Sequence, residues 1–203
     1  MPSSTPVVTV VITSYNSGDF LPRAVRSVLA QTFTDFEILV VDDGSARPQP
    51  EIVELDARIR FHSQENQGVS VARNVGVAMA RADLIAFLDH DDVWYPSKLE
   101  RQLAQVAEVP DAAFWCTGFD WVRDSWTTPS TLRELDYATM LRGTTILPST
   151  VVLRKARYLA AGGHNPLFTH LEDGDLFLRL AMHGPDPAVI PEPLVRYELH
   201  ETN

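Results

Sequence analysis

Residues 84–94 read "LIAFLDHDDVW", an apolar run that ends in three aspartates within four positions. The apolar part is too short for an ordinary helix and has the composition of a buried strand. Side chains at positions i and i+2 of a strand share a face, so Asp89 and Asp91 are predicted to point together while His90 points away. Asp92 is predicted to be a turn residue.

Two earlier segments repeat this arrangement of a buried strand followed by polar residues. The β-branched run 7–13 leads into "TSYN", and the apolar run 37–41 is closed by "DDGS". Helical periodicity follows the first run at 21–29, and a further strand and helix are predicted at 58–63 and 69–82. Continuous apolar strands that alternate with helices predict an α/β fold with a mainly parallel central sheet flanked by helices. Ligands bind at the carboxyl ends of such strands, so the three polar clusters are expected to converge at one edge.

The second half of the chain is less regular. A helix is predicted to begin at Ser97, because Ser97 and Glu100 have the spacing of a capping box. The remaining predictions are a strand in 112–122, a loop with a short helix in 124–136, a strand and a helix in 145–163, a helix in 172–184 and two short extended pieces in 187–200, broken by prolines.

Composition limits the classes of function. The chain has 203 residues, enough for one large domain, and a formal net charge of −10, which argues against a nucleic-acid partner. An anionic phosphate ester would need a cation to be held by so acidic a chain. A single cysteine, Cys116, no secretory leader pattern and no apolar run of membrane-spanning length predict a cytoplasmic protein without a transmembrane segment.

The acidic clusters each allow two interpretations. Asp89 and Asp91 are either a hard-oxygen site for Mg²⁺ or Mn²⁺ or a solvated strand end. Asp42 and Asp43 either bind a base or ribose or form an Asx-type turn. The acids of "EDGD" (172–175) either complement a helix dipole or include a general base.

Other residues give weaker signals. Tyr15 is a candidate for stacking on a base, or a routine turn residue between a strand and a helix. His62, His164 and His200 are assigned surface or turn roles on residue type alone. Because no glycine-rich phosphate loop and no nucleophile motif is present, a nucleotide site here must use acids and a metal.

The order of the motifs resembles the family 2 glycosyltransferases with the GT-A fold. The resemblance is carried by "VVITSYNSGDFLPRAVRSVLAQTFTDFEILVVDDGS" and "NQGVSVARNVGVAMARADLIAFLDHDDVWYPSKLERQL", and more loosely by "STVVLRKARYLAAGGHN", "LEDGDLFLRL" and "YELHETN". It implies a Rossmann-like nucleotide-diphospho-sugar transferase fold and inverting transfer from a nucleotide sugar, expected to be a UDP-sugar. The expected acceptor is a hydroxyl of a saccharide or lipid-linked saccharide, in cell-surface polysaccharide or glycolipid synthesis at the inner face of the membrane.

The resemblance also implies roles for individual residues. The positions that match the nucleotide site are Thr13, Tyr15, Asp42, Asp43, Arg73 and Asp89, with Asp42 as the alternative to Asp43. The positions that match the Mn²⁺ or Mg²⁺ site are Asp89, Asp91 and His200, with Asp91 as the expected direct ligand. Asp173 matches the catalytic base. His200 thereby becomes a candidate site residue instead of a surface histidine.

The chain departs from the family pattern in three places. His164-Asn165 stands where Phe-Asp is common, Ala82-Asp83 stands where a glycine usually precedes the acid, and the sequence stops at Asn203 inside the last motif. A single domain is expected over 1–203, truncated at its C-terminus, with a nucleotide-sugar half (1–110) and an acceptor and catalytic-base half (111–203).

Two rival functions stay open. The strand ending in D-x-D also resembles the nucleophile loop of haloacid-dehalogenase-type phosphatases, although that family opens its core domain with this strand. A non-catalytic domain that binds a sugar nucleotide is the second rival.

Overall fold

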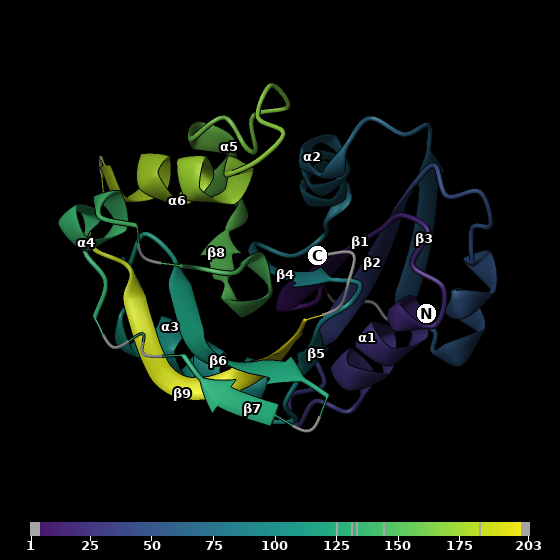
Figure 1. The fold of residues 1–203 in the computed structure, drawn as a ribbon, viewed down its shortest axis with the longest axis horizontal. Coiled ribbons are helices and arrows are strands. Elements are labelled where there is room, and N and C mark those ends of the chain that lie inside the picture. The colour runs from purple at the N-terminus through teal and green to yellow at the C-terminus, as the bar shows by residue number, and fades with distance from the viewer. Residues whose placement is uncertain are drawn as a thin grey trace.

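The computed structural model describes residues 5–199 except 125, 131, 133, 144 and 183. These residues form a nine-stranded sheet with helices on both faces (Figure 1). The elements are β1 (Val8–Ser14), α1 (Phe20–Leu29), β2 (Phe36–Asp43), η1 (Pro50–Leu55), β3 (Ile59–Gln64), α2 (Val69–Met79), β4 (Leu84–Asp89), β5 (Val93–Trp94), α3 (Lys98–Glu108), β6 (Trp115–Arg123), β7 (Trp126–Pro129), α4 (Tyr137–Leu141), η2 (Pro148–Thr150), β8 (Val152–Arg154), α5 (Lys155–Ala160), α6 (Glu172–Met182) and β9 (Ala188–Glu198); η denotes a 3₁₀ helix.

The first half contains the predicted parallel sheet. β3, β2, β1 and β4 lie side by side in parallel, and Thr13 pairs in register with both Val41 and Asp89. Alternate residues of β1 are buried on opposite faces, with Val10 packed in the cluster that includes α1 and Val11 in the cluster that includes α6. The α/β prediction is confirmed, and so is the convergence of the three strand ends at one edge.

The second half continues the same sheet. β8 pairs antiparallel with β4, β6 follows β8, and β9 lies between β6 and β5. α5 and α6 lie on the same side of the sheet as α2 (Figure 1). The sheet therefore joins the two parts of the chain that carry the predicted nucleotide site and the predicted base.

One strand was predicted wrongly as two pieces. β9 is a single strand of 11 residues that contains Pro191 and Pro193. Its register with β6 shifts on both sides of Gly118, and a Cβ at Gly118 would lie 2.5 Å from the carbonyl oxygen of Pro191. The prolines are accommodated because the ladder is already irregular where they lie.

Two local predictions were also wrong. Ser97 is the N-cap of α3 but its side chain makes no capping hydrogen bond, and Glu100 instead accepts a hydrogen bond of 2.6 Å from Thr32. A capping box is present at α4, between Asp136 and Thr139. The segment 124–136, predicted as a loop with a helix, contains β7 as an antiparallel partner of β6.

Candidate active site

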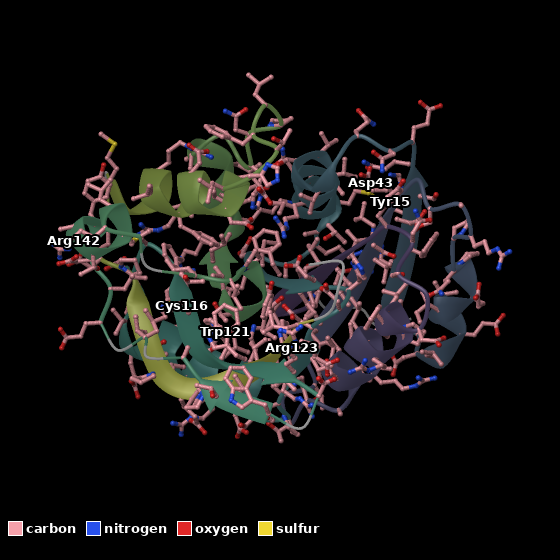
Figure 2. The ribbon with its side chains drawn as sticks, viewed as in Figure 1. Tyr15, Asp43, Cys116, Trp121, Arg123 and Arg142 are labelled. Atoms are coloured by element: carbon pink, nitrogen blue, oxygen red, sulfur yellow. The ribbon has the colours of Figure 1, made fainter. Side chains whose placement is uncertain are left out.

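A pocket lies at the carboxyl edge of the parallel strands. Its lining includes Thr13, Tyr15, Asp43, Gly68, Ala72 and His90. Figure 2 shows Tyr15 and Asp43 close to each other, far from Trp121 and Arg123 on the β6–β7 hairpin. The structure thus brings together four segments that are separated in sequence. His90, predicted to point away from the site, belongs to the pocket wall.

Asp43 builds part of this wall through its hydrogen bonds. Its Oδ1 accepts from the side chain of Gln64 (2.8 Å) and the backbone N–H of Gln67 (3.0 Å), and its Oδ2 accepts from the backbone N–H of Gly68 (2.8 Å). The carboxylate therefore fixes the loop between β3 and α2, whose end lines the pocket.

Asp42 has a different environment. It is buried, and its carboxylate accepts hydrogen bonds from the backbone N–H and the hydroxyl of Ser45 and from Ser63. This is the Asx-type turn that the sequence allowed. Of the two adjacent aspartates, only Asp43 is among the described residues that line the pocket.

Beside the pocket, Arg73 joins three carboxylates. Its guanidinium donates to Asp89 (2.8 Å), Asp173 (2.6 Å) and Glu172 (3.4 Å). The Arg73 side chain is 4% exposed, so the ion pairs lie largely out of water. Arg73 and its three carboxylate partners are not among the described residues that line the pocket, but Asp89 pairs in register with the pocket residue Thr13, so this cluster, named the Arg73 cluster below, lies at the same edge of the sheet.

The charges of the Arg73 cluster stabilise one another. Burial alone would lower the pKa of Arg73, but the nearby carboxylates of Asp89, Asp173 and Glu172 raise it above its ordinary value. Burial alone would raise the pKa of Asp173, but Arg73 and a hydrogen bond from His164 lower it. Asp173 is therefore ionised at neutral pH and able to accept a proton.

His164 is not the surface or turn residue that its residue type suggested. It is 1% exposed, and its Nε2 lies 2.9 Å from Oδ1 of Asp173. Burial lowers the pKa of His164, which favours the neutral ring. The sequence held one signal of this role, namely a histidine at the position where the family commonly has phenylalanine.

The end of the opening stretch also differs from the prediction. β4 ends at Asp89, and the backbone N–H of Asp92 donates to the carbonyl of Asp89 (3.1 Å), so Asp91 lies in a turn. The prediction that Asp89 and Asp91 share a strand face therefore does not apply, because Asp91 is not in the strand. Asp92 is 1% exposed, and Ser149 links it to this turn: the Ser149 hydroxyl accepts from the backbone of Asp89 and donates to Asp92.

The acids of this turn provide oxygen ligands of the kind that Mg²⁺ and Mn²⁺ prefer. Oδ1 of Asp92 is buried and makes no hydrogen bond to the described residues, and Asp89 and Asp91 precede it in the same turn. Within the described ranges, no group of three or more His, Cys, Asp and Glu side chains has the geometry of a metal site. His200, the third predicted ligand, lies outside the described residues. Asp89 and Asp91 alone would supply two carboxylates to a cation, which would then keep several waters.

Comparison with known proteins identifies the class. The crystal structure of residues 1–349 of S. aureus TarS in complex with UDP-GlcNAc superposes with a TM-score of 0.83 at 19% identity, covering 96% of this chain and 59% of that one. The fold is therefore that of a GT-A type glycosyltransferase. The sequence profile of glycosyl transferase family 2 matches residues 9–159, and the chain belongs to this family.

Two bacterial glycosyltransferases match about half of the chain in sequence. An uncharacterized glycosyltransferase of Nostoc sp. (strain PCC 7120) is 41% identical over 109 residues, which cover 51% of this chain and 34% of that protein. TuaG of Bacillus subtilis (strain 168), named as a teichuronic acid biosynthesis glycosyltransferase, is 39% identical over 119 residues, covering 56% of this chain and 47% of TuaG. The chain matches less than half the length of both relatives. No helix among the described residues is long and apolar enough to cross a membrane.

Proposed function

We propose that the chain transfers a sugar, with inversion at the anomeric carbon, from a UDP-sugar to a hydroxyl acceptor. The observation that carries this proposal is the position of Asp173, an ionised and partly buried carboxylate that Arg73 joins to Asp89 at the strand edge where the pocket lies. The single displacement needs one base and no enzyme nucleophile.

The pocket supports nucleotide binding through shape and aromatic surface. Tyr15 is 50% exposed at the pocket wall, so its ring is free to stack on a base. Thr13 and Asp43 lie on the same wall. We assign these residues, with Arg73 and Asp89 next to them, to the donor site, and Asp42 to the turn that supports Asp43.

The transfer step assigns the proton to Asp173. The acceptor oxygen forms a bond to the anomeric carbon, and the bond from that carbon to the diphosphate oxygen breaks. The hydroxyl proton moves to the Asp173 carboxylate, and the electron pair leaves with the nucleoside diphosphate. Arg73 holds the Asp173 carboxylate and the Asp89 carboxylate on one guanidinium, which keeps the base at the edge of the donor pocket.

Asp89 and Asp91 are proposed to hold Mn²⁺ or Mg²⁺, with His200 as a third ligand by resemblance. When bound, the cation would offset the charge of the departing diphosphate, which a chain with a net charge of −10 cannot do by its overall field. Asp91→Ala should remove this contribution without unfolding the strand, because Asp91 lies beyond the end of β4.

The acceptor is proposed to be a saccharide or a lipid-linked saccharide of a cell-surface polymer. The name of TuaG, which refers to teichuronic acid biosynthesis, and the UDP-GlcNAc complex of TarS support this choice. A cytoplasmic location, with acceptors presented at the inner face of the membrane, belongs to the same proposal.

The function is tested by donor binding and turnover in the purified chain. Melting temperatures are measured with UDP, GDP and their sugars in the presence of Mn²⁺, and nucleotide release is then followed for the sugars that raise them. We expect UDP compounds to give the largest shift. Tyr15→Ala should reduce that shift, while Trp126→Ala, which removes an equally exposed aromatic ring on β7, should not.

Two outcomes would replace the proposal. Hydrolysis of an aryl phosphate without use of any nucleotide sugar would favour the phosphatase, which the family and the fold do not support. UDP-sugar binding without release of UDP, even into water, would favour a non-catalytic binding domain.

A further inference from the structure

We infer that His164 is a positioning residue that holds the carboxylate of Asp173 by donating a hydrogen bond to Oδ1. This inference rests on the proposed role of Asp173 as the base. His164 lies in the loop between α5 and α6, nine residues before Asp173, and its Nε2 is 2.9 Å from Oδ1.

The contacts of Asp173 with Arg73 and His164 converge on one of its two oxygens. Arg73 (2.6 Å) and His164 both contact Oδ1, and Oδ2 takes part in neither contact. A carboxylate fixed in this way presents a defined second oxygen to the acceptor hydroxyl. Arg73 donates a charged hydrogen bond to Oδ1, and His164 donates a second hydrogen bond from a different side. Together the two bonds fix the orientation of the Asp173 carboxylate.

His164 is itself fixed on both its backbone and its ring. The side-chain amide of Asn74 donates to the carbonyl of His164 (2.8 Å) and accepts from its N–H (3.0 Å). The hydroxyl of Tyr158 lies 2.8 Å from Nδ1 of the ring. Asn74 is the neighbour of Arg73 on α2, so both groups that hold Asp173 are anchored to the same helix.

The proton of the neutral ring is assigned by these partners. An ionised carboxylate only accepts hydrogen bonds, so Nε2 facing Asp173 carries the hydrogen. Nδ1 then accepts from the Tyr158 hydroxyl. The Tyr158 hydroxyl also lies 2.5 Å from Oδ1 of Asn74, so this oxygen and Nδ1 share a single hydroxyl hydrogen.

The charged groups that act on the pair and on Tyr158 come from α2 and α6. Arg73 of α2 and Glu172 of α6 act on both Asp173 and His164, and Arg179 of α6 acts on Tyr158 of α5. Asp89 contacts the pair only through Arg73. Burial and the Arg73 cation both disfavour a second proton on His164, so the ring stays a neutral donor at neutral pH.

The first test is kinetic and uses two variants. His164→Phe keeps an aromatic ring and removes the donor, while His164→Gln places an amide N–H near the position of Nε2. His164→Phe should lower kcat by about 10- to 100-fold, the range for losing a hydrogen bond to a charged group, with the donor KM unchanged. The acid limb of its pH–rate profile should move to higher pH, because the hydrogen bond lowers the pKa of Asp173. His164→Gln should recover part of the lost kcat, and its acid limb should lie close to that of the wild type.

The second test does not depend on turnover. Long-range ¹H–¹⁵N spectra of histidine-labelled protein should show His164 as the Nε2–H tautomer at pH 7, and Asp173→Asn should shift its Nε2 resonance. The tautomer can be measured whether or not the protein transfers a sugar. A failure of the inference about His164 can therefore be distinguished from a failure of the proposed function.

Three results would overturn the inference: unchanged kcat and acid limb in a folded His164→Phe, equal loss in the Phe and Gln variants, or an Nδ1–H tautomer. Should His164→Phe fail to fold, the Gln variant and the spectra decide the question.

Discussion

Arg73 is the residue that connects the two proposed roles of the site. One buried guanidinium contacts an acid at the end of β4 and two acids in the first turn of α6. Acids in a first helical turn commonly complement the helix dipole, but Asp173 and Glu172 also have a specific cationic partner. The proposed donor site and the proposed base are therefore joined by the same structural contacts.

Arg73→Met should destabilise the fold strongly. Removing one partner of a buried ion pair leaves uncompensated charges, at a cost of about 3–5 kcal/mol. Urea denaturation measures this cost. The control is Arg101→Met, because the pair of Arg101 and Glu192 is largely exposed and should contribute less than about 1 kcal/mol. Similar losses in the two variants would contradict the assignment.

The buried ring of His164 should make stability depend on pH. Burial lowers its pKa below the ordinary value of 6.5, so the unfolded chain binds this proton more readily than the folded chain. The stabilisation is fully present above pH 6.5 and is lost as the pH falls through the lowered folded pKa. Urea unfolding at a series of pH values from 7.5 to about 5 should show the decline. His164→Phe should show a flatter dependence over this interval, and an equal slope would rule out the contribution.

At the scale of elements, periodicity predicted the parallel half well. Continuous apolar runs such as Phe36–Asp43 and Leu84–Asp89 are buried on both faces, and their polar ends converge as expected. Short and irregular elements were missed because they depend on distant partners. β5 has two residues and pairs with β9, about 100 positions away, and β7 pairs with β6, off the main strand order of the described sheet.

The loop that carries His164 gives a prediction at the same scale. Gly162 and Gly163 both have positive φ (86° and 69°), but only at Gly163 does an added Cβ meet neighbours, at 2.5 Å from Oδ1 of Asn74. Gly163→Ala should therefore cost about 1–3 kcal/mol more than Gly162→Ala, because both share the backbone strain and one adds a steric clash. Equilibrium denaturation of the two variants checks this, and equal losses would argue against close packing of this loop on α2.

At the scale of the whole molecule, the fold places residues of both halves at one edge of a continuous sheet. The motifs around Thr13, Asp43 and Asp89 could be predicted to meet because parallel strands share an edge. The position of Asp173 came from the resemblance alone, since no periodic pattern relates α6 to β4. For His164 the sequence offered only its departure from the family pattern, because its role depends on contacts with Asn74 and Asp173 that only the folded chain makes.

The acidity of the molecule leads to a prediction about metal removal. A net charge of −10 disfavours an anionic donor, so UDP binding should depend on a divalent cation. EDTA should abolish the UDP-induced rise in melting temperature, and added Mn²⁺ should restore it. Asp91→Ala should lose the Mn²⁺-dependent part. UDP binding of equal strength with and without metal, in both proteins, would reject the proposed cation site.

The central claim is that Asp173 is the base of a sugar-transfer reaction, and the most direct test compares turnover with donor binding in Asp173→Asn. The variant should lower kcat for UDP release by about 10²- to 10⁴-fold, the range for a general base, while the Kd for UDP stays within about twofold of the wild type. Asp175→Asn is the matched control, because Asp175 lies in the same helical turn and pairs with Arg179 instead of Arg73. Loss of turnover in Asp173→Asn with donor binding retained is the predicted result, and turnover near the wild-type rate would contradict the claim.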